Sequence, residues 1–222
     1  LEGLVPKSEA KYGAGTKKRC NNRVPKERAQ RREIRTQVDF PSPTLPRLSV
    51  SWRTPASKYG SVDTAVHNIL FDLLFGGTSA LNKKLVLESG WLAGMGEWSW
   101  DHRDPYMFQV VSTVKDASKM KEIEAEIHAA VADLAKNGPS PERLEAVKSH
   151  VRYRSLLQLE TPNTIAYQLA FNMGAGGSPN DFASLLTSIS KLTPKDVQAF
   201  AKKYLTKKNR AVTVLRGPEK KS

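Results

Sequence analysis

The stretch "ILFDLLFGGTSALNKKLVLESGWLAG", residues 69–94, decides the fold. Its apolar residues recur at intervals of three and four, the spacing of one helical face, until Gly76 and Gly77 end the helix. A second, shorter helix is expected to begin at Thr78 or Ser79, with an inner face formed by Leu81, Leu85 and Val86. No catalytic-looking pair of residues lies in this stretch. Its pattern therefore predicts secondary structure and does not by itself predict a function.

A strand is predicted immediately before this helical pair. "RLSVSWRTP", residues 47–55, alternates so that one face carries Leu48, Val50 and Trp52. Ser61 is the expected N-cap of the first helix, because its hydroxyl can accept from a free amide of the first turn.

Two more strands are predicted after the helical pair. "GWLAGMGEWSW" (90–100) and "YMFQVVSTV" (106–114) are joined by the turn-prone "DHRDP" and are most like paired strands. The glycines of the first strand indicate a β-bulge, or a neighbour that lies close to its backbone.

The second half of the chain is predicted to be mainly helical. Apolar periodicity and capping residues indicate helices over 118–136, 140–160, 162–173, 179–190 and 194–204. "RAVTVLRG" (210–217) is expected to be a last strand, and "REIRTQVDF" (32–40) a weak edge strand. The order predicts an α+β fold in which long helices cover one face of a mainly antiparallel sheet.

Composition sets limits on the class of protein. With 222 residues, 39% of them hydrophobic, the chain can bury the core of one large domain or two small ones. No run of about 18 apolar residues occurs, so no membrane span is expected. The first residues lack an initiator Met and do not resemble a signal peptide, so we expect a piece of a longer protein. Cys20 is the only cysteine, which excludes an internal disulfide and a multi-cysteine zinc site.

The net charge of +13 is concentrated near the start of the chain. Residues 1–35 hold 11 Lys and Arg against 4 Asp and Glu, and their densest piece, "KKRCNNRVPKERAQRR" (17–32), has no aromatic residue for base stacking. A solvated linker is the favoured interpretation, and a partner-docking strip is the second. Nucleic-acid or anionic-surface binding is a third hypothesis that a steep salt dependence would test. The expected organisation is a tail of a preceding domain, a basic linker, a peptidase-like domain and a disordered tail, over 1–15, 16–40, 36–217 and 218–222.

The sequence contains no credible catalytic or metal-binding pattern. The four histidines form neither H-E-x-x-H nor its inverse, the spacings that place two imidazoles beside one zinc ion. Glu124 and His128 are four apart but lack a third ligand, so we interpret them as charged helix surface. His67 is expected at the boundary of the core, and exposed positions are expected for His102 and His150.

Several phrases, in order, resemble the C-terminal half of zinc metallopeptidases of the pitrilysin, insulinase and mitochondrial-processing-peptidase type. The resemblance covers about residues 36–217, and its phrases are "SVSWRTPA" (49–56), the stretch at 69–94, "KNGPSPERLEAVKSHVRYR" (136–154), "TIAYQLAFNMGAG" (164–176) and "LTPKDVQAFAKKYLTKKNRAVTVLRG" (192–217). It implies the metallopeptidase-half fold, without metal ligands or catalytic residues in this chain.

The resemblance also implies a partner. Zinc would be a cofactor of an H-x-x-E-H-containing catalytic half or subunit, and the two halves, in one chain or as a homo- or heterodimer, would enclose a peptide substrate. Nucleic acid is not an expected partner. The compartment is not fixed: bacterial periplasm, envelope or cytoplasm is suggested, or an organelle.

The family often has an Arg and a Tyr that reach the substrate from this second half. Alignment on Gly90 places Val86 and Ala93 at those positions, and neither side chain can donate a hydrogen bond to a peptide carbonyl. The candidate substrate-binding residues that remain are Lys84, Glu88, Trp91 and Trp98. The alternative interpretation is that either tryptophan fills the core.

Two hypotheses arise from the resemblance. In the first, the chain is the non-catalytic half of a zinc peptidase and helps to hold a peptide for hydrolysis elsewhere. In the second, motivated by Val86 and Ala93, it is a peptidase-like scaffold with no proteolytic role.

Overall fold

A computed structural model describes residues 27–157, 159–174 and 177–218. The expected tail of a preceding domain, the basic segment up to residue 26 and the last four residues lie outside the described residues. No helix in the described part combines the length and the apolar character needed to cross a bilayer.

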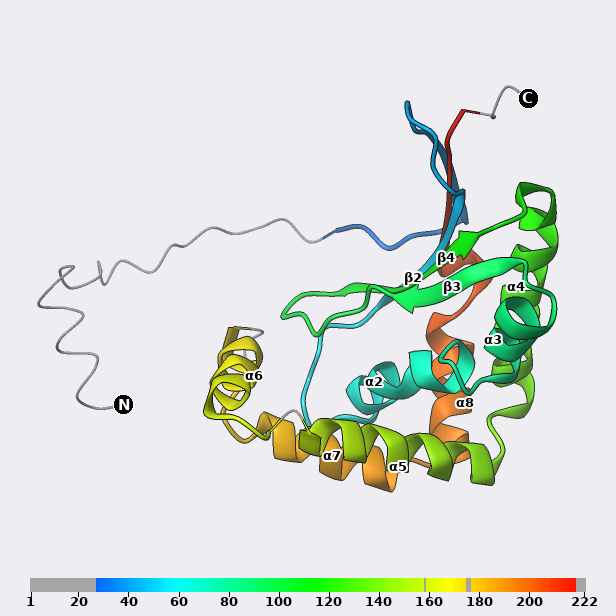
Figure 1. Ribbon diagram of the computed structural model, residues 1–222. Helices are drawn as coiled ribbons and strands as arrows, with labels where there is room; N and C mark the ends of the chain where they lie inside the picture. The colour runs from blue at the N-terminus through cyan, green and yellow to red at the C-terminus, as the bar shows by residue number, and fades with distance from the viewer. Residues whose placement is uncertain (1–26, 158, 175–176, 219–222) are drawn as a thin grey trace, which may run out of the picture.

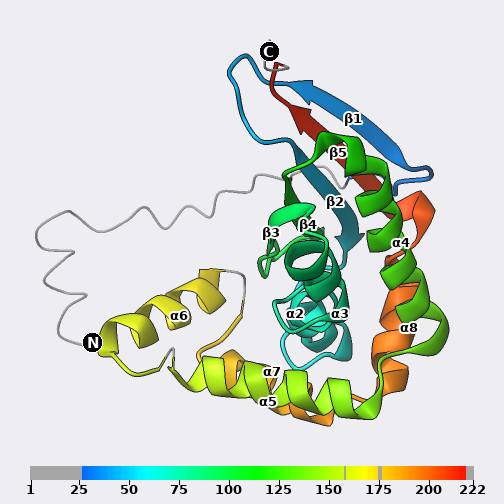
Figure 2. The ribbon, with the colours of Figure 1, turned by 45° about the vertical axis from the view of Figure 1, so that its right-hand side comes forward.

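Five strands form one sheet in the order β1-β5-β2-β4-β3 (Figure 2). Their bounds are β1 Ile34–Asp39, β2 Arg47–Thr54, β3 Leu92–Glu97, β4 Tyr106–Val114 and β5 Arg210–Arg216. All neighbouring pairs are antiparallel except β1 and β5, which run parallel. The sheet therefore includes Ile34, which precedes the expected start of the domain, and strands β1 and β3 form its two edges.

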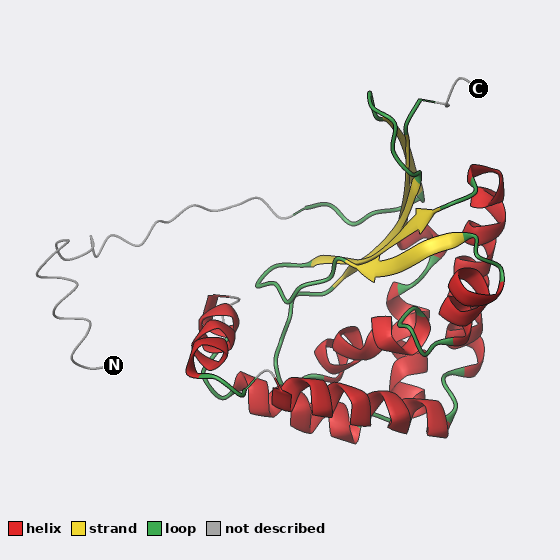
Figure 3. Cartoon of the chain, viewed as in Figure 1, coloured by secondary structure: helices red, strands yellow, loops and turns green. Residues whose placement is uncertain are grey.

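The helices cover one face of this sheet, as Figures 1 and 3 show. Their bounds are α2 Val62–Leu74, α3 Ala80–Asn82, α4 Met120–Asn137, α5 Pro141–Leu157, α6 Pro162–Gly174, α7 Asp181–Lys191 and α8 Pro194–Tyr204. The predicted α+β class, with helices packed on one face of a mainly antiparallel sheet, is confirmed.

Local capping chemistry explains where the helices begin and turn. Ser61 accepts from the Thr64 amide at the start of α2, and Thr193 forms a capping box with Asp196 around Pro194. Gly138 ends α4 with φ 73°, and a Cβ there would lie 3.2 Å from the Pro194 carbonyl oxygen. A side chain at position 138 would therefore be strained twice, by its backbone angle and by its neighbour.

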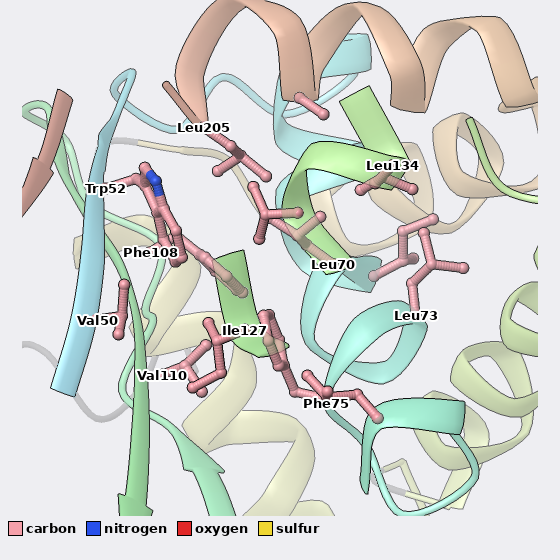
Figure 4. Close-up of a cluster of buried hydrophobic side chains, with 14 of the residues drawn as sticks. Val50, Trp52, Leu70, Leu73, Phe75, Phe108, Val110, Ile127, Leu134 and Leu205 are labelled. Carbon is pink, nitrogen blue, oxygen red and sulfur yellow. The ribbon is translucent and has the colours of Figure 1, made fainter. Parts of the chain in front are cut away.

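The core lies between the sheet and α2, α4 and α8 (Figure 4). The predicted face of β2 is confirmed, since Leu48, Val50 and Trp52 are all buried. Phe108 on β4 is fully buried beside Trp52, with their ring centroids 6.3 Å apart. This apolar face ties β2 and β4 to α2 and so fixes where the rest of the sheet can lie.

The second helix differs from its prediction. It begins at the predicted Ser79 cap, but after α3 the backbone continues as a π-helical segment, η1, over Lys83–Glu88. The Ser89 amide donates a hydrogen bond to the Lys84 carbonyl, five residues back in the chain. This wider turn buries Leu85 and leaves Val86 only partly covered, because one extra residue rotates the face that meets the core.

The interpretation of Glu124 and His128 as charged helix surface is wrong, because their side chains are only 13% and 22% exposed. The Glu124 side chain on α4 is 13% exposed and takes two hydrogen bonds from Arg35 of β1, at 2.8 and 2.7 Å. Arg35 also contacts Glu33, which accepts from Arg210 of β5. These four residues, Glu33, Arg35, Glu124 and Arg210, form an ion-pair network, called here the Glu33 network, that joins both strands to α4.

Candidate functional site

The outer edge of β3, called here the β3 edge, is uncovered in the described part of the chain. β3 pairs with β4 on one side, and in the sheet order no strand follows it on the other. The Trp98 amide donates to the Gln109 carbonyl of β4 at 3.0 Å, so the backbone groups of residue 98 point inward. Because direction alternates along an antiparallel ladder, the amides and carbonyls of Glu97 and Met95 point outward.

The glycines of β3 leave the face of the sheet away from the helices bare next to this edge. A Cβ built at Gly94 or Gly96 would meet no atom within 4 Å. A bulge interrupts the pairing between Leu92 and Gly94, as one of the two sequence interpretations predicted. The described chain therefore leaves the face of β3 away from the helices open beside its unpaired edge.

The two candidate tryptophans lie at opposite ends of β3. Trp98 is 58% exposed, so the alternative that it fills the core is wrong. Trp91 is half-buried against the core, and the Lys119 ammonium lies 5.4 Å from the centre of its ring. Seven residues of extended chain separate them by roughly 23 Å, so a single peptide side chain cannot contact both.

The remaining candidate residues do not form one cluster with Trp98. Lys84 on η1 donates to Glu126 of α4 at 2.7 Å, which uses its charge within the domain. Glu88 at the end of η1 is exposed. Val86 packs partly against the core, while Ala93 on β3 is exposed. Neither Val86 nor Ala93 adds a side-chain hydrogen bond to this surface.

A polar cluster behind the end of β3 was not predicted. Asp101, in the connection from β3 to β4, accepts from Ser57 at 2.9 Å and from the Tyr59 hydroxyl at 3.2 Å. Asn68 of α2 donates to the same carboxylate at 3.3 Å. Burial, then the Asp101 charge, raises the pKa of Tyr59 above its usual range, so the phenol stays a donor. The cluster fixes the chain that follows β3 onto α2.

The histidines take structural positions. His67 is half-buried and lies 2.7 Å from the Ser99 hydroxyl through Nε2, and burial lowers its pKa. Its predicted place at the core boundary is confirmed, as is the exposure of His150. The prediction for His102 is wrong: its ring lies 3.8 Å from that of Tyr106, and its Nε2 is buried without a partner among the described residues.

The described residues do not fit a zinc centre. Residues 27–157, 159–174 and 177–218 contain no group of three or more His, Cys, Asp or Glu side chains placed to hold a metal. Protein zinc sites ordinarily supply three or four such ligands.

Glu97 gives the β3 edge a titratable group. It lies near the ion pair of Asp72 and Arg154, whose Oδ2 and Nη2 are 3.0 Å apart. Burial, then the charge of Asp72, raises the pKa of Glu97 to about 7, against the opposing charge of Arg154. The residue remains in contact with solvent, which screens part of this effect and reduces its contribution to stability without changing the sign.

We expect Glu97→Gln to stabilise the fold above pH 7 and not near pH 4. Because the folded pKa lies above the ordinary 4.5, the folded state binds this proton more tightly, and stability decreases as pH rises from 4.5 to about 7. The glutamine has no proton to lose, so it escapes the decrease. Thermal unfolding at pH 4 and pH 8 measures the difference, with exposed Asp104→Asn as control. An equal effect of Glu97→Gln at both pH values would contradict the prediction.

Sequence comparison identifies the family. A sequence model described as the peptidase M16 inactive domain matches residues 2–151, more than half of the chain. The chain belongs to this family. It is therefore a non-catalytic, peptidase-like domain, and the resemblance found in the sequence is confirmed. No curated protein matches the chain significantly.

Solved structures share the fold. A protease from Helicobacter pylori has a TM-score of 0.85 at 16% identity, covering 97% of this chain and 52% of that one. The peptidase M16 inactive domain from Pseudomonas fluorescens has a TM-score of 0.70 at 17% identity, covering 87% and 45%. An inactive peptidase domain from Bordetella parapertussis has a TM-score of 0.69 at 18% identity, covering 82% and 97%. The M16 inactive domain of this chain thus spans about half the length of the first two structures.

Proposed function

We propose that this chain is the non-catalytic half of a zinc metallopeptidase, and that it helps to enclose and bind an extended peptide. Hydrolysis would occur at a zinc site on another domain or subunit. The observation that carries the proposal is the uncovered β3 edge in a domain of an inactive-peptidase family. The likeness in fold to about half of the Helicobacter pylori protease supports a catalytic half on another domain or subunit.

The β3 edge would bind the peptide by strand addition. The outward amides and carbonyls of Met95 and Glu97 offer main-chain hydrogen bonds, which hold an extended peptide with little regard to its sequence. Trp98, at the end of the strand, adds an exposed apolar surface. Because the side chains of Val86 and Ala93 cannot donate hydrogen bonds, the backbone amides of β3 would bind the peptide carbonyls.

Zinc would act only in the partner half, where a bound metal activates water for attack on an amide. The described residues of this chain do not offer such a ligand set. We therefore expect the isolated chain to bind no stoichiometric zinc, measured by elemental analysis after dialysis. One tightly bound equivalent per chain would contradict the prediction.

We expect Glu97→Pro to weaken binding of an extended peptide at least ten-fold. Proline removes the outward amide of residue 97, while the inward amides that pair with β4 remain. The measurement is fluorescence polarisation of a labelled, unstructured decapeptide. Glu97→Gln is the matched control, because it removes the same carboxylate and keeps the amide.

Peptide chemistry gives an independent arm of this experiment. N-methylation of alternate residues removes the amides from one edge of an extended peptide. Methylation in one register should abolish binding, and methylation in the other should not. Equal affinity of both methylated peptides, together with unchanged binding by Glu97→Pro, would overturn strand addition at β3.

The natural partner distinguishes the scaffold hypothesis from the proposed role as half of a peptidase. Reconstitution of this chain with a half that contains H-x-x-E-H should give peptide cleavage that a metal chelator stops. A natural partner that lacks this motif, and a complex that binds peptides without cleaving them, would favour the scaffold.

A further inference from the structure

A cavity of about 270 Å³ lies directly beyond the end of β3. Its walls come from the segment after β3, from α2, and from α5, α6 and α7. Ser99, Trp100 and Asp101 line it, and the first of these is two residues past Glu97. A peptide that pairs along the β3 edge would therefore have one of its ends next to this cavity.

Aromatic rings form the rim of the cavity. The Trp100 ring lies 5.8 Å from Phe171 of α6, and Phe171 lies 6.5 Å from Tyr167, in a stacked arrangement. Trp100 is 47% exposed and Tyr167 is 64% exposed. Rings with free faces can stack on a further aromatic ring.

The part of the lining that comes from α7 is apolar, with Leu185 and Ile189 among its residues. Three polar side chains of the lining, Ser99, Asn68 and Gln168, already have hydrogen-bond partners. Asn68 donates to Thr64 and Asp101, and Gln168 donates to Asn172 at 3.0 Å. Because these groups have partners, the cavity favours a neutral side chain over one that brings an uncompensated charge.

The two charged residues of the lining also have partners, which again favours a neutral ligand. Arg154 is paired with Asp72, so part of its charge is already compensated before a ligand binds. Asp101 is held by Ser57, Tyr59 and Asn68. The volume is somewhat below the range of drug-sized pockets and fits one large side chain.

Helix α6 allows the cavity to adjust. Asn172 is its one fully buried residue, and the helix projects away from the layer of α5 and α7 (Figure 1). A shift of α6 would therefore disturb little of the core.

We propose that this cavity binds an aromatic side chain of the extended peptide that pairs with the β3 edge. The inference rests on the proposed function, because β3 gives the peptide its direction, and it adds a preference for an aromatic residue at one position. The chain would thus contribute specificity as well as main-chain binding.

Two pairs of probes separate this inference from the proposed function. N-acetyl-L-phenylalaninamide and N-acetyl-L-alaninamide test the cavity alone by NMR titration, without strand pairing. Two labelled decapeptides that differ by Phe or Ala at one position test it together with β3. We expect the phenylalanine amide to bind and the alanine amide not to bind, and the Phe decapeptide to bind at least ten-fold more tightly than the Ala decapeptide.

Variants identify the cavity. Ser155→Leu fills it from the buried side of α5, so the preference for Phe should vanish while the Ala decapeptide binds as before. Ser190→Leu is its control, since Ser190 of α7 is exposed and does not line the cavity. Tyr167→Ala, at the rim, should reduce the preference three-fold or more, and Tyr153→Ala, equally exposed on α5, should not. Circular dichroism checks that each variant is folded.

These experiments can disprove the aromatic-binding cavity and strand addition at β3 separately. Equal binding of the Phe and Ala decapeptides, with loss of both in Glu97→Pro, overturns the cavity and keeps strand addition. A Phe preference that survives in folded Ser155→Leu and Tyr167→Ala also overturns it. Binding of the phenylalanine amide to wild type and not to Ser155→Leu supports the cavity even if no decapeptide pairs with β3.

Discussion

Arg210→Met is expected to lower the free energy of unfolding by about 2–3 kcal/mol. Arg210 and Glu33 are 13% and 15% exposed, and both the Nε and an Nη of Arg210 donate to one oxygen of Glu33. Removal of the guanidinium leaves a largely buried carboxylate whose remaining partner is Arg35, at 3.0 Å. The cost comes from that unpaired charge, since burial without a partner is unfavourable. Urea unfolding of wild type and variant measures it.

A double variant and an exposed pair serve as controls. Arg210→Met combined with Glu33→Leu removes both charges and should recover most of the loss, because an apolar pair can replace a buried ion pair. Arg103→Met breaks an ion pair with Asp104 in which both side chains are more than two thirds exposed, and should cost less than about 0.5 kcal/mol. Similar losses for Arg210→Met and Arg103→Met would show that the Glu33 network does not support the fold.

The Glu33 network also sets an acid limit on stability. Burial would raise the pKa of Glu33, but hydrogen bonds from Arg210 and Arg35 outweigh it and lower the pKa below 4.5. The hydrogen bonds from Arg35 likewise lower the pKa of Glu124. Both carboxylates therefore contribute fully above pH 4.5, and their contribution is lost as pH falls through their lower folded values.

The sequence predicted the parts of the fold that depend on local periodicity. Leu48, Val50 and Trp52 alternate along β2, and the cap at Ser61 marks the start of α2, so both elements could be placed from neighbours in the chain. The π-helical segment could not, because Leu81 and Leu85 suit either helical form until the core selects one. The parallel pairing of β1 with β5 depends on residues far apart in sequence, which no local pattern records.

The candidate site was only partly predictable for the same reason. Trp98 was a candidate substrate-binding residue because its side chain is large and apolar. Whether it would be exposed depended on where β3 stopped pairing with β4. Asp101 gave no signal, because its partners Ser57, Tyr59 and Asn68 are ordinary polar residues until the fold brings them together. Arg35 and Glu124 are 89 residues apart, so each looked like solvated charge.

Phe108 is the residue through which the core supports the β3 edge. It is fully buried on β4, the strand that pairs with β3. Its ring centroid lies 6.3 Å from Trp52, 6.0 Å from His67 and 6.2 Å from Phe75, so it joins β2 to the middle and the C-terminal end of α2 (Figure 4). His67 in turn contacts Ser99, which lies just beyond β3. Packing at position 108 thus reaches both the sheet and the segment after its edge strand.

Phe108→Ala is accordingly expected to cost about 3–5 kcal/mol, the range for a buried Phe whose removal leaves a cavity that the surrounding strands cannot close. Phe108→Leu fills most of the volume and should cost about 1 kcal/mol. Met107→Ala, on the opposite face of the same strand and 38% exposed, should cost less than either. Urea unfolding gives the three values, and peptide binding to folded Phe108→Ala shows whether loss of the ring also loosens β3. A loss in Phe108→Ala no larger than that in Met107→Ala would mean that the aromatic cluster does not hold β4 in place, and the β3 edge would then need another support.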